Sequence, residues 1–273
     1  MNKKLGKISI YLVLIVFSIL MLFPFYWMII SSLKSNLEIS QKPPTFFPND
    51  ITFDNYAKVL EVVNWERYFL NSIIVAGLCV LVTLYTTITG AYFLSKSQLP
   101  GKHFILGILI GLMMVPYELL IVTNYTTIVK MNLNDSLLAL VLPFMSSIFY
   151  TLLLKNYFDS ISPSLYNAVM VDGGGEWRYL WRILVPASKP MLISISLFTL
   201  ISSWNSFMWP LLIIKSEANR TVTFGVYAFI SEGGEHFELM MALSVLSILP
   251  MVLVFAFMRK YLIRGVKFSG TKG

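Results

Sequence analysis

Apolar residues dominate six long segments of the chain, and polar residues separate these segments. The segments span residues 8–33, 68–94, 104–129, 137–158, 191–214 and 239–263. Each is long enough to cross the apolar core of a bilayer as a helix, which takes about 20 residues. None alternates apolar and polar positions as the strands of a membrane barrel do. The pattern predicts an all-α polytopic membrane protein with six transmembrane helices.

Prolines and one acidic residue interrupt two of these segments. Pro116 and Glu118 lie in the third segment, so its outer end is expected to bend or to border a cavity. Pro143 predicts a kink in the fourth, relieved by neighbouring helices. Glu118 is the exception among spans almost free of ionisable groups, and it has either a solvated, cavity-edge role or a role in ion coupling.

Composition supports a membrane protein and argues against a nucleic-acid partner. Charged residues make up 13% of the 273 positions, about half the share of a soluble domain. The net charge is +7, but Lys and Arg lie at segment ends, as topology signals do, and not along one face. The single cysteine, Cys79, lies inside an apolar segment, so no disulfide framework is available.

The distribution of Lys and Arg predicts the orientation in the membrane. With the N-terminus inside, 14 of the 21 basic residues fall on cytoplasmic segments and 7 on outer ones. The positive-inside rule therefore places the N-terminal residues 1–7, the loop 159–190 and the tail 264–273 in the cytoplasm. The six spans between them form one transmembrane domain, residues 8–263.

The sequence contains no chemistry that would drive transport. No catalytic constellation or phosphate-binding loop is present, and His103 and His236 fall on opposite sides of the membrane, so they cannot share a metal. A self-sufficient channel or ion-coupled carrier would need ionisable groups at mid-membrane or an inverted repeat, and neither is visible. We therefore expect a non-catalytic subunit that takes its energy from a partner.

The cytoplasmic insert 162–190 is polar, carries charges of both signs and lies between two apolar segments. Its pattern predicts a short helix over 165–171, a flexible joint at Gly173-Gly174-Gly175 and a second amphipathic helix over 176–185 that Pro186 stops. Such an insert in an apolar chain predicts a docking element for a partner outside the bilayer.

This insert resembles the cytoplasmic EAA loop of ABC-importer permeases. In that loop Glu-Ala-Ala is followed by three residues, Gly, nine residues, Ile, any residue, Leu and Pro. The matching positions are Asn167, Ala168, Val169, Gly173, Ile183, Val185 and Pro186, with Asp172 before the glycine. Asn167, Val169 and Val185 depart from the family residues Glu, Ala and Leu, while the spacing is kept.

The departure at Asn167 bears on how the loop meets its partner. In the family this carboxylate can meet a basic residue of the ATPase, and Asn lacks the charge-assisted part of that bond. The charged role is then carried by Asp172 or Glu176, or the contact is weaker. Asp172 has the alternative of accepting a local turn or helix-cap hydrogen bond beside Gly173.

The rest of the chain resembles the carbohydrate importers of the maltose-transporter MalG type. The similarity covers essentially the whole chain, and its strength lies in the order of individually weak signals. These signals are Phe23-Pro24-Phe25-Tyr26-Trp27, Ser32-Leu33-Lys34, Asn55-Tyr56, Phe69-Leu70-Asn71-Ser72, Pro100-Gly101-Lys102, the run 204–211 and the tail 265–273.

The resemblance implies a complex in the bacterial cell membrane. Its expected members are a second, MalF-like permease, a dimer of ABC ATPase subunits and an extracytoplasmic solute-binding protein that delivers a sugar. ATP and magnesium would be bound by the ATPases, so no cofactor is expected in this chain. The EAA loop would act as a coupling helix in a cleft of one ATPase. A related importer for a non-sugar solute is the alternative.

Three residues of the fifth segment are candidates for the sugar pathway. Trp204, Asn205 and Trp209 combine aromatic rings with an amide, and rings cover pyranose faces while amides bind hydroxyls. The alternative is helix packing through an Asn hydrogen bond. The resemblance implies that the partner permease makes most of the sugar contacts.

Overall fold

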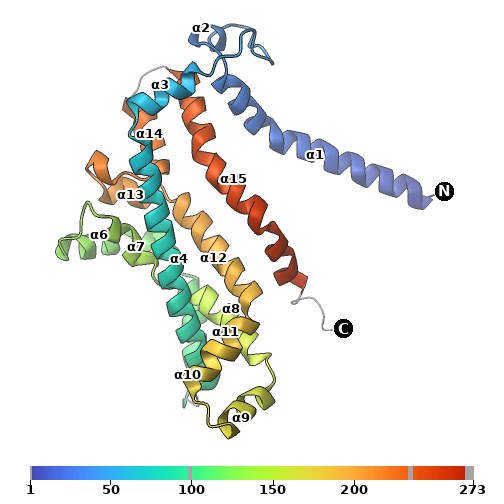
Figure 1. The fold of residues 1–273 in the computed structure, drawn as a ribbon, viewed down its shortest axis with the longest axis vertical. Helices are drawn as coiled ribbons and strands as arrows, with labels where there is room; N and C mark the ends of the chain where they lie inside the picture. The colour runs from blue at the N-terminus through green and yellow to red at the C-terminus, as the bar shows by residue number, and fades with distance from the viewer. Residues whose placement is uncertain (1, 98–99, 233–235, 268–273) are drawn as a thin grey trace. The chain divides into compact units, whose positions relative to one another are not determined.

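The computed structural model describes residues 2–97, 100–232 and 236–267, and the described residues form helices and connecting segments without a strand (Figure 1). The chain divides into two compact units. The first unit comprises Met1–Trp65 and Phe224–Val252, and the second comprises Glu66–Thr223 and Leu253–Gly273. Each unit is described by itself below.

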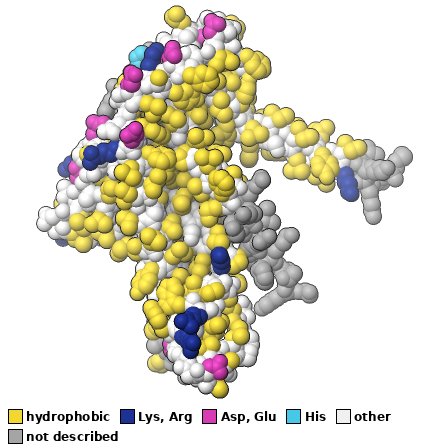
Figure 2. All heavy atoms as spheres, in the orientation of Figure 1, with side chains coloured by type: hydrophobic (Ala, Val, Ile, Leu, Met, Phe, Trp, Pro, Cys, Tyr) yellow, Lys and Arg dark blue, Asp and Glu magenta, His cyan; other side chains and the backbone are white. Residues whose placement is uncertain are grey.

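The first unit is built around two long apolar helices. Its elements are α1 (Asn2–Ser32), α2 (Asn36–Ile39), α3 (Asp54–Val62), most of α14 (Val222–Glu232) and the first half of α15 (Phe237–Lys267). The most apolar 18-residue stretch of α1 contains no buried residue. Apolar side chains are exposed along the length of α1, and Figure 2 shows many of them on one face, as expected of a helix that meets lipid or another subunit.

Contacts at the C-terminal end of α1 account for two sequence motifs of the first unit, Ser32-Leu33-Lys34 and Asn55-Tyr56. Asn55 donates from its amide to the carbonyl oxygens of Ser32, at 2.9 Å, and Lys34, at 2.8 Å. The hydroxyls of Tyr56 and Ser32 lie 2.7 Å apart. The last carbonyl groups of a helix have no hydrogen-bond partners within the helix. Asn55 supplies such partners for the carbonyls of Ser32 and Lys34, which explains why the Asn55-Tyr56 and Ser32-Leu33-Lys34 motifs occur together.

The second unit contains the remaining helices. They are α4 (Trp65–Lys96, from Glu66), α5 (Lys102–Met113), η1 (Tyr117–Leu120), α6 (Ile121–Lys130), α7 (Leu137–Val141), η2 (Leu142–Phe144), α8 (Ile148–Asp159), α9 (Pro163–Val171), α10 (Glu176–Tyr179), η3 (Leu180–Leu184), α11 (Val185–Ala187), α12 (Lys189–Trp204), α13 (Met208–Ile213) and η4 (Glu217–Asn219).

Length and composition allow up to six membrane spans among the described residues. Three helices qualify alone: Lys7–Ser32, Trp65–Lys96 and Phe237–Met258. Three bent pairs qualify together: α5 with η1 and α6 (88°), α7 and η2 with α8 (50°), and α10–α11 with α12 (76°). The bends predicted near Pro116 and Pro143 are thus confirmed.

Side chains of α4 and α13 satisfy the backbone where the fourth segment breaks. Pro143 has no N–H, which leaves the carbonyl four residues earlier, that of Ala139, without its helical partner. The indole N–H of Trp209 donates to this carbonyl at 2.9 Å. Thr83 and Thr86 of α4 donate from Oγ1 to the carbonyls of Phe144 (3.0 Å) and Met145 (2.7 Å). Such pairing is what allows a broken helix inside a membrane.

The fifth apolar segment is also broken, which its sequence did not predict. Helix α12 ends at Trp204, and α13 begins at Met208. The hydroxyl of Thr223 donates to the carbonyl of Trp204 at 2.6 Å. Polar residues gather at this interruption, namely Ser202, Ser203, Asn205 and Ser206, but the sequence analysis took the segment 191–214 as one continuous span.

Asp135 organises the loop between α6 and α7. Its Oδ1 accepts hydrogen bonds from the backbone N–H groups of Lys215 (3.0 Å) and Ser216 (3.1 Å) and from the Ser216 hydroxyl (3.0 Å). Partial burial raises the pKa of this carboxyl, but the hydrogen bonds from Ser216, Lys215 and Asn219 outweigh it and lower the pKa below 3.8. The ionised form therefore stabilises the fold.

Replacing Asp135 by Asn should reduce thermal stability at neutral pH, because the amide oxygen is a weaker acceptor than a carboxylate. A carboxyl group whose pKa is lower in the folded than in the unfolded protein stabilises the fold at pH values above its unfolded-state pKa. This contribution disappears as the pH falls through the folded-state pKa. The difference in melting temperature between wild type and Asp135→Asn, measured in detergent, should be largest near pH 7 and should narrow below about pH 4. A difference independent of pH would contradict this role.

Candidate coupling element and cavity

The predicted EAA loop forms a helical hairpin at the end of α4 that carries Lys96 (Figure 1). Helix α9 begins after Ser162, whose hydroxyl accepts from the backbone N–H of Ser164 at 3.4 Å. Pro163 occupies the first turn, where a missing N–H is harmless. The predicted helix over 165–171 is therefore present and begins two residues earlier.

The glycine joint after α9 is a packed turn and not a loose connection. Gly173 has φ of +73°, a conformation that residues with side chains rarely adopt. The N–H of Gly174 donates to the carbonyl of Val169 at 2.8 Å. A Cβ on Gly174 would lie 2.6 Å from Val169 Cγ1 and 2.8 Å from its carbonyl oxygen. The expectation of a flexible joint is therefore wrong, because backbone and side chain of α9 close against Gly174.

The second helix of the loop does not stop at Pro186. Helical structure runs from Glu176 through α10, η3 and α11 to Ala187, and the 76° bend follows there. Segment η3 is a π-helical turn, in which the N–H of Val185 bonds the carbonyl of Leu180. We attribute the continuation to this turn, whose wider spacing accommodates a residue that lacks an N–H. The prediction that Pro186 ends the helix was wrong for this reason.

The hairpin packs tightly against the body of the second unit. Tyr179, Leu180 and Leu184 are at most 1% exposed. They belong to one cluster with buried residues of α4, α8 and α12, namely Ile88, Ala91, Leu154, Phe158 and Ile195. Ile183 and Val185 of the predicted motif, and Val169 of α9, pack against this cluster. These motif residues therefore connect the hairpin to three helices.

Glu176 holds α4, α9 and α10 together. Its two carboxylate oxygens accept hydrogen bonds from the hydroxyls of Tyr92 on α4 and Tyr166 on α9. The Lys96 ammonium lies 4.7 Å from the ring centre of Tyr166 and 5.3 Å from that of Tyr179. Because its oxygens are engaged within the chain, Glu176 is better placed to stiffen the hairpin than to receive a partner's charge.

One face of α9 points away from the cluster. Asn167, Ala168 and Val171 are exposed at positions i, i+1 and i+4, and Asp172 is exposed beside them. Val171 is 87% exposed, and the Trp177 indole on α10 is 64% exposed. Leu165, 47% exposed, Ala168 and Val171 lie at i, i+3 and i+6, so this face exposes several apolar side chains together, as an interaction surface does.

The three predicted pathway residues do not gather at one site. Trp204 and Trp209 are buried, and Trp204 packs edge-on against Phe69 with ring centres 5.6 Å apart. Trp209 donates its indole N–H to Ala139. Asn205 is exposed at the end of α12. The two tryptophans therefore have packing roles in this structure, whereas the alternative weighed from the sequence was packing through a hydrogen bond of Asn205.

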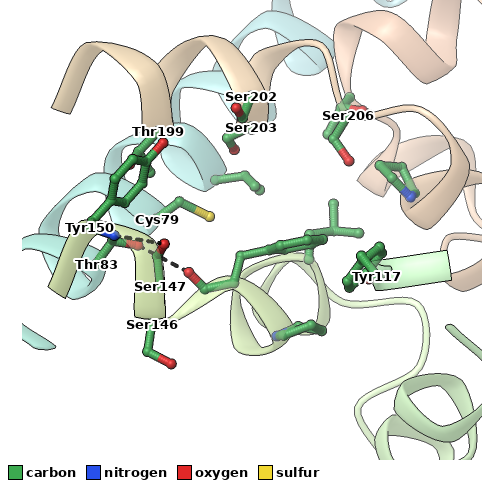
Figure 3. Close-up of a pocket in the computed structure, with 16 residues that line it drawn as sticks. Cys79, Thr83, Tyr117, Ser146, Ser147, Tyr150, Thr199, Ser202, Ser203 and Ser206 are labelled. Carbon is green, nitrogen blue, oxygen red and sulfur yellow. Dashed lines mark hydrogen bonds between the residues drawn. The ribbon is translucent and has the colours of Figure 1, made fainter. Parts of the chain in front are cut away.

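The second unit contains a cavity of about 340 Å³ that these residues do not line. Its walls come from α4, η1, the break between α7 and α8, α12 and α13 (Figure 3). No charged side chain is among the described residues that line it. Apolar atoms make up most of the cavity surface, but ten of the sixteen lining residues carry a hydroxyl group: Thr83, Tyr117, Ser146, Ser147, Tyr150, Thr199, Ser202, Ser203, Ser206 and Thr221.

The sequence analysis missed this cavity, although one signal was available. Thr199, Ser202 and Ser203 lie at i, i+3 and i+4, which places them along one face of α12, and Ser206 follows in the segment after that helix (Figure 3). Hydroxyls in an apolar helix also bond their own backbone, so the spacing alone does not distinguish a cavity wall from a packed face. No comparable sequence pattern indicated that Tyr92 and Tyr166 donate hydrogen bonds to Glu176.

Adding a methyl group at Gly174 should disturb the hairpin far more than at Gly175. The Gly174→Ala side chain would overlap Val169, and overpacking of this kind lowers stability by about 1–3 kcal/mol. Gly175→Ala is the matched control, because no heavy atom lies within 4 Å of its Cβ position and its φ is −97°. Thermal unfolding in detergent measures both variants. Equal effects would contradict the packed turn.

Comparison with known proteins identifies the family to which this chain belongs. The family described as "Binding-protein-dependent transport system inner membrane component" matches residues 87–268. The arabinooligosaccharides transport system permease protein AraQ of Bacillus subtilis (strain 168) is 27% identical over 270 residues, covering 98% of this chain and 96% of that protein. The sn-glycerol-3-phosphate transport system permease protein UgpE of Yersinia pestis bv. Antiqua (strain Antiqua) is 28% identical over 273 residues, with 97% of both chains covered.

A solved structure shows the same fold. A chain in the crystal structure of a bacterial ABC transporter involved in the import of the acidic polysaccharide alginate superposes with a TM-score of 0.84 at 24% identity, covering 95% of this chain and 97% of that one. The fold is thus that of an ABC-importer permease. Since the family match covers well over half of the sequence, including all of α9–α11, the chain belongs to the family of binding-protein-dependent transport system inner membrane components.

Proposed function

We propose that this chain is a permease subunit of an ATP-driven importer for a sugar or oligosaccharide, and that it forms half of the translocation pathway. The observation that carries the proposal is the α9–α11 hairpin within the family match, with an exposed apolar face on one side and a packed face on the other. The relative named for arabinooligosaccharides supports a sugar. The relative named for sn-glycerol 3-phosphate keeps a non-sugar solute as the alternative.

The mechanism follows from how the hairpin is attached. We infer that the exposed face of α9, with Asn167, Ala168 and Val171, lies in a cleft of an ATPase subunit, while Asp172 offers the free carboxylate of the loop. Tyr179, Leu180 and Leu184 tie the hairpin to α4, α8 and α12. When the ATPases close on ATP, a hairpin held this firmly displaces all three helices together. The chain itself supplies no step of ATP hydrolysis.

The proposed complex has four further partners in addition to the lipid bilayer. These are a second permease, two ATPase subunits that bind ATP and magnesium, and an extracytoplasmic solute-binding protein. The excess of Lys and Arg on one side supports an orientation with both termini and the loop 159–190 in the cytoplasm of a bacterium. Described residues hold no group of three or more His, Cys, Asp or Glu side chains placed to bind a metal.

The first test is reconstitution. The chain alone in proteoliposomes should neither hydrolyse ATP nor take up sugar, and both activities should appear when the second permease, the ATPase and the binding protein are added together. Uptake of radiolabelled sugar and phosphate release are the measurements. Uptake by the chain alone, driven by an ion gradient, would instead favour a self-sufficient carrier.

A charge on the exposed face of α9 should separate the chain from its ATPase. Val171→Asp places a carboxylate in an apolar contact, where an unpaired charge loses several kcal/mol of hydration, so ATPase retention and stimulated hydrolysis should fall at least about tenfold. Met131→Asp is the matched control, since Met131 is 53% exposed at the end of α6, away from the hairpin. Equal retention of the ATPase by both variants would refute the assigned surface.

A further inference from the structure

Three hydroxyl groups on the cavity wall make no hydrogen bond of normal geometry with the described residues. They are Tyr117 Oη on η1, near Asn124, Thr199 Oγ1 on α12, near Tyr150, and Thr221 Oγ1 in the segment before α14. Buried polar groups in native proteins are almost always paired, and leaving one unpaired is unfavourable. Since these hydroxyls come from three separate elements and line one cavity, their partner is expected to lie inside it.

The cavity can hold more than isolated water molecules. Its volume of about 340 Å³ falls within the range of about 300–1,000 Å³ typical of small-molecule sites. It lies at the middle of α4, because Cys79 and Thr83 of that helix are on its wall (Figure 3). A site at this depth in a membrane helix is where a solute crossing the bilayer would pass.

The lining selects for a neutral, polyhydroxylated molecule. A phosphate or a carboxylate would lose its hydration without gaining an opposite charge, because no Lys or Arg lines the cavity among the described residues. Hydroxyl groups both donate and accept, so Thr199, Thr221 and their neighbours match the hydroxyls of a sugar. Tyr117, Phe144 and Tyr150 add aromatic rings for its C–H faces.

We propose that this cavity is a binding subsite for a neutral sugar within this chain, contacted by Tyr117, Thr199 and Thr221. The inference rests on the proposed function and deepens it in two respects. It assigns a sugar contact to this subunit as well as to its partner permease, and it excludes phosphorylated and acidic solutes from the subsite. Trp204, Asn205 and Trp209 are outside it.

The single cysteine of the chain provides a reporter on the cavity wall. Cys79 can be labelled with a small methanethiosulfonate reagent in the complete reconstituted complex, without any engineered thiol. The probe is whichever of glucose, maltotriose and arabinotriose the complex imports fastest, and sn-glycerol 3-phosphate is the anionic comparison. The neutral sugar should protect Cys79 from labelling, and the phosphate ester should not.

Two substitutions test whether the unpaired hydroxyls bind the sugar. Thr199→Val and Thr221→Val keep nearly the same shape and remove a hydroxyl that makes no hydrogen bond of normal geometry within the chain, so melting temperature should stay the same or rise. Each should raise the sugar concentration that halves Cys79 labelling by about three- to tenfold, which corresponds to one neutral hydrogen bond. Thr87→Val is the matched control, because Thr87 is equally buried and unpaired on α4 but does not line the cavity.

The outcomes separate this subsite from the proposed function. Two results would overturn the subsite and leave the permease assignment intact. One is that Thr199→Val and Thr221→Val still import sugar and the sugar protects Cys79 from labelling as it does in the wild type. The other is that sn-glycerol 3-phosphate protects Cys79. If the reagent does not label Cys79, the measurement is repeated with Ser203→Cys in a Cys79→Ser background. If neither thiol reacts, the cavity is closed to solutes and the subsite is overturned. Import of none of the sugars by the complete complex overturns the proposed function itself.

Discussion

The requirement that every backbone N–H and C=O inside a bilayer finds a partner shapes the whole second unit. The fourth apolar segment breaks at Pro143, and the freed carbonyls are satisfied by Trp209, Thr83 and Thr86. These bonds place α13 on one side of the break and α4 on the other. The same break turns Ser146 and Ser147 toward the cavity. A constraint on hydrogen bonding thus produces both the packing of the helices and the polar space between them.

The hairpin depends on a different kind of contact. Its buried face is apolar and aromatic, and the Tyr92–Glu176–Tyr166 bridge adds a charged group whose oxygens are both engaged. Gly174 packs closely against Val169 of α9. The loop is therefore joined to α4, α8 and α12 through many contacts, which is the property that transmission of a rigid-body movement requires.

Much of the fold follows from local sequence, because hydropathy and proline act over one helix. The six apolar segments and the bends near Pro116 and Pro143 were predicted in this way. The same holds for the family, since the spacing from Ala168 to Pro186 is a local pattern that the comparison with known proteins supports.

Features that depend on distant residues could not be predicted. Pro186 continues a helix because a π turn precedes it, and Gly174 is required because Val169 folds back onto it. Trp209 is buried because Ala139, 70 positions away, has a free carbonyl. The cavity needs hydroxyls from five or more elements to meet, and no single segment shows that they do.

The exposed apolar surfaces of the chain also affect its stability before it assembles with its partners. Helix α1 buries none of its apolar core stretch, and Val171 is 87% exposed on α9. Partners that cover such surfaces stabilise the folded state by mass action. A chain synthesised in excess of its partners therefore stays less stable, and membrane proteases that sample exposed apolar segments would remove it. The surface that we propose for the ATPase contact would thus also help to set how many copies of the subunit persist.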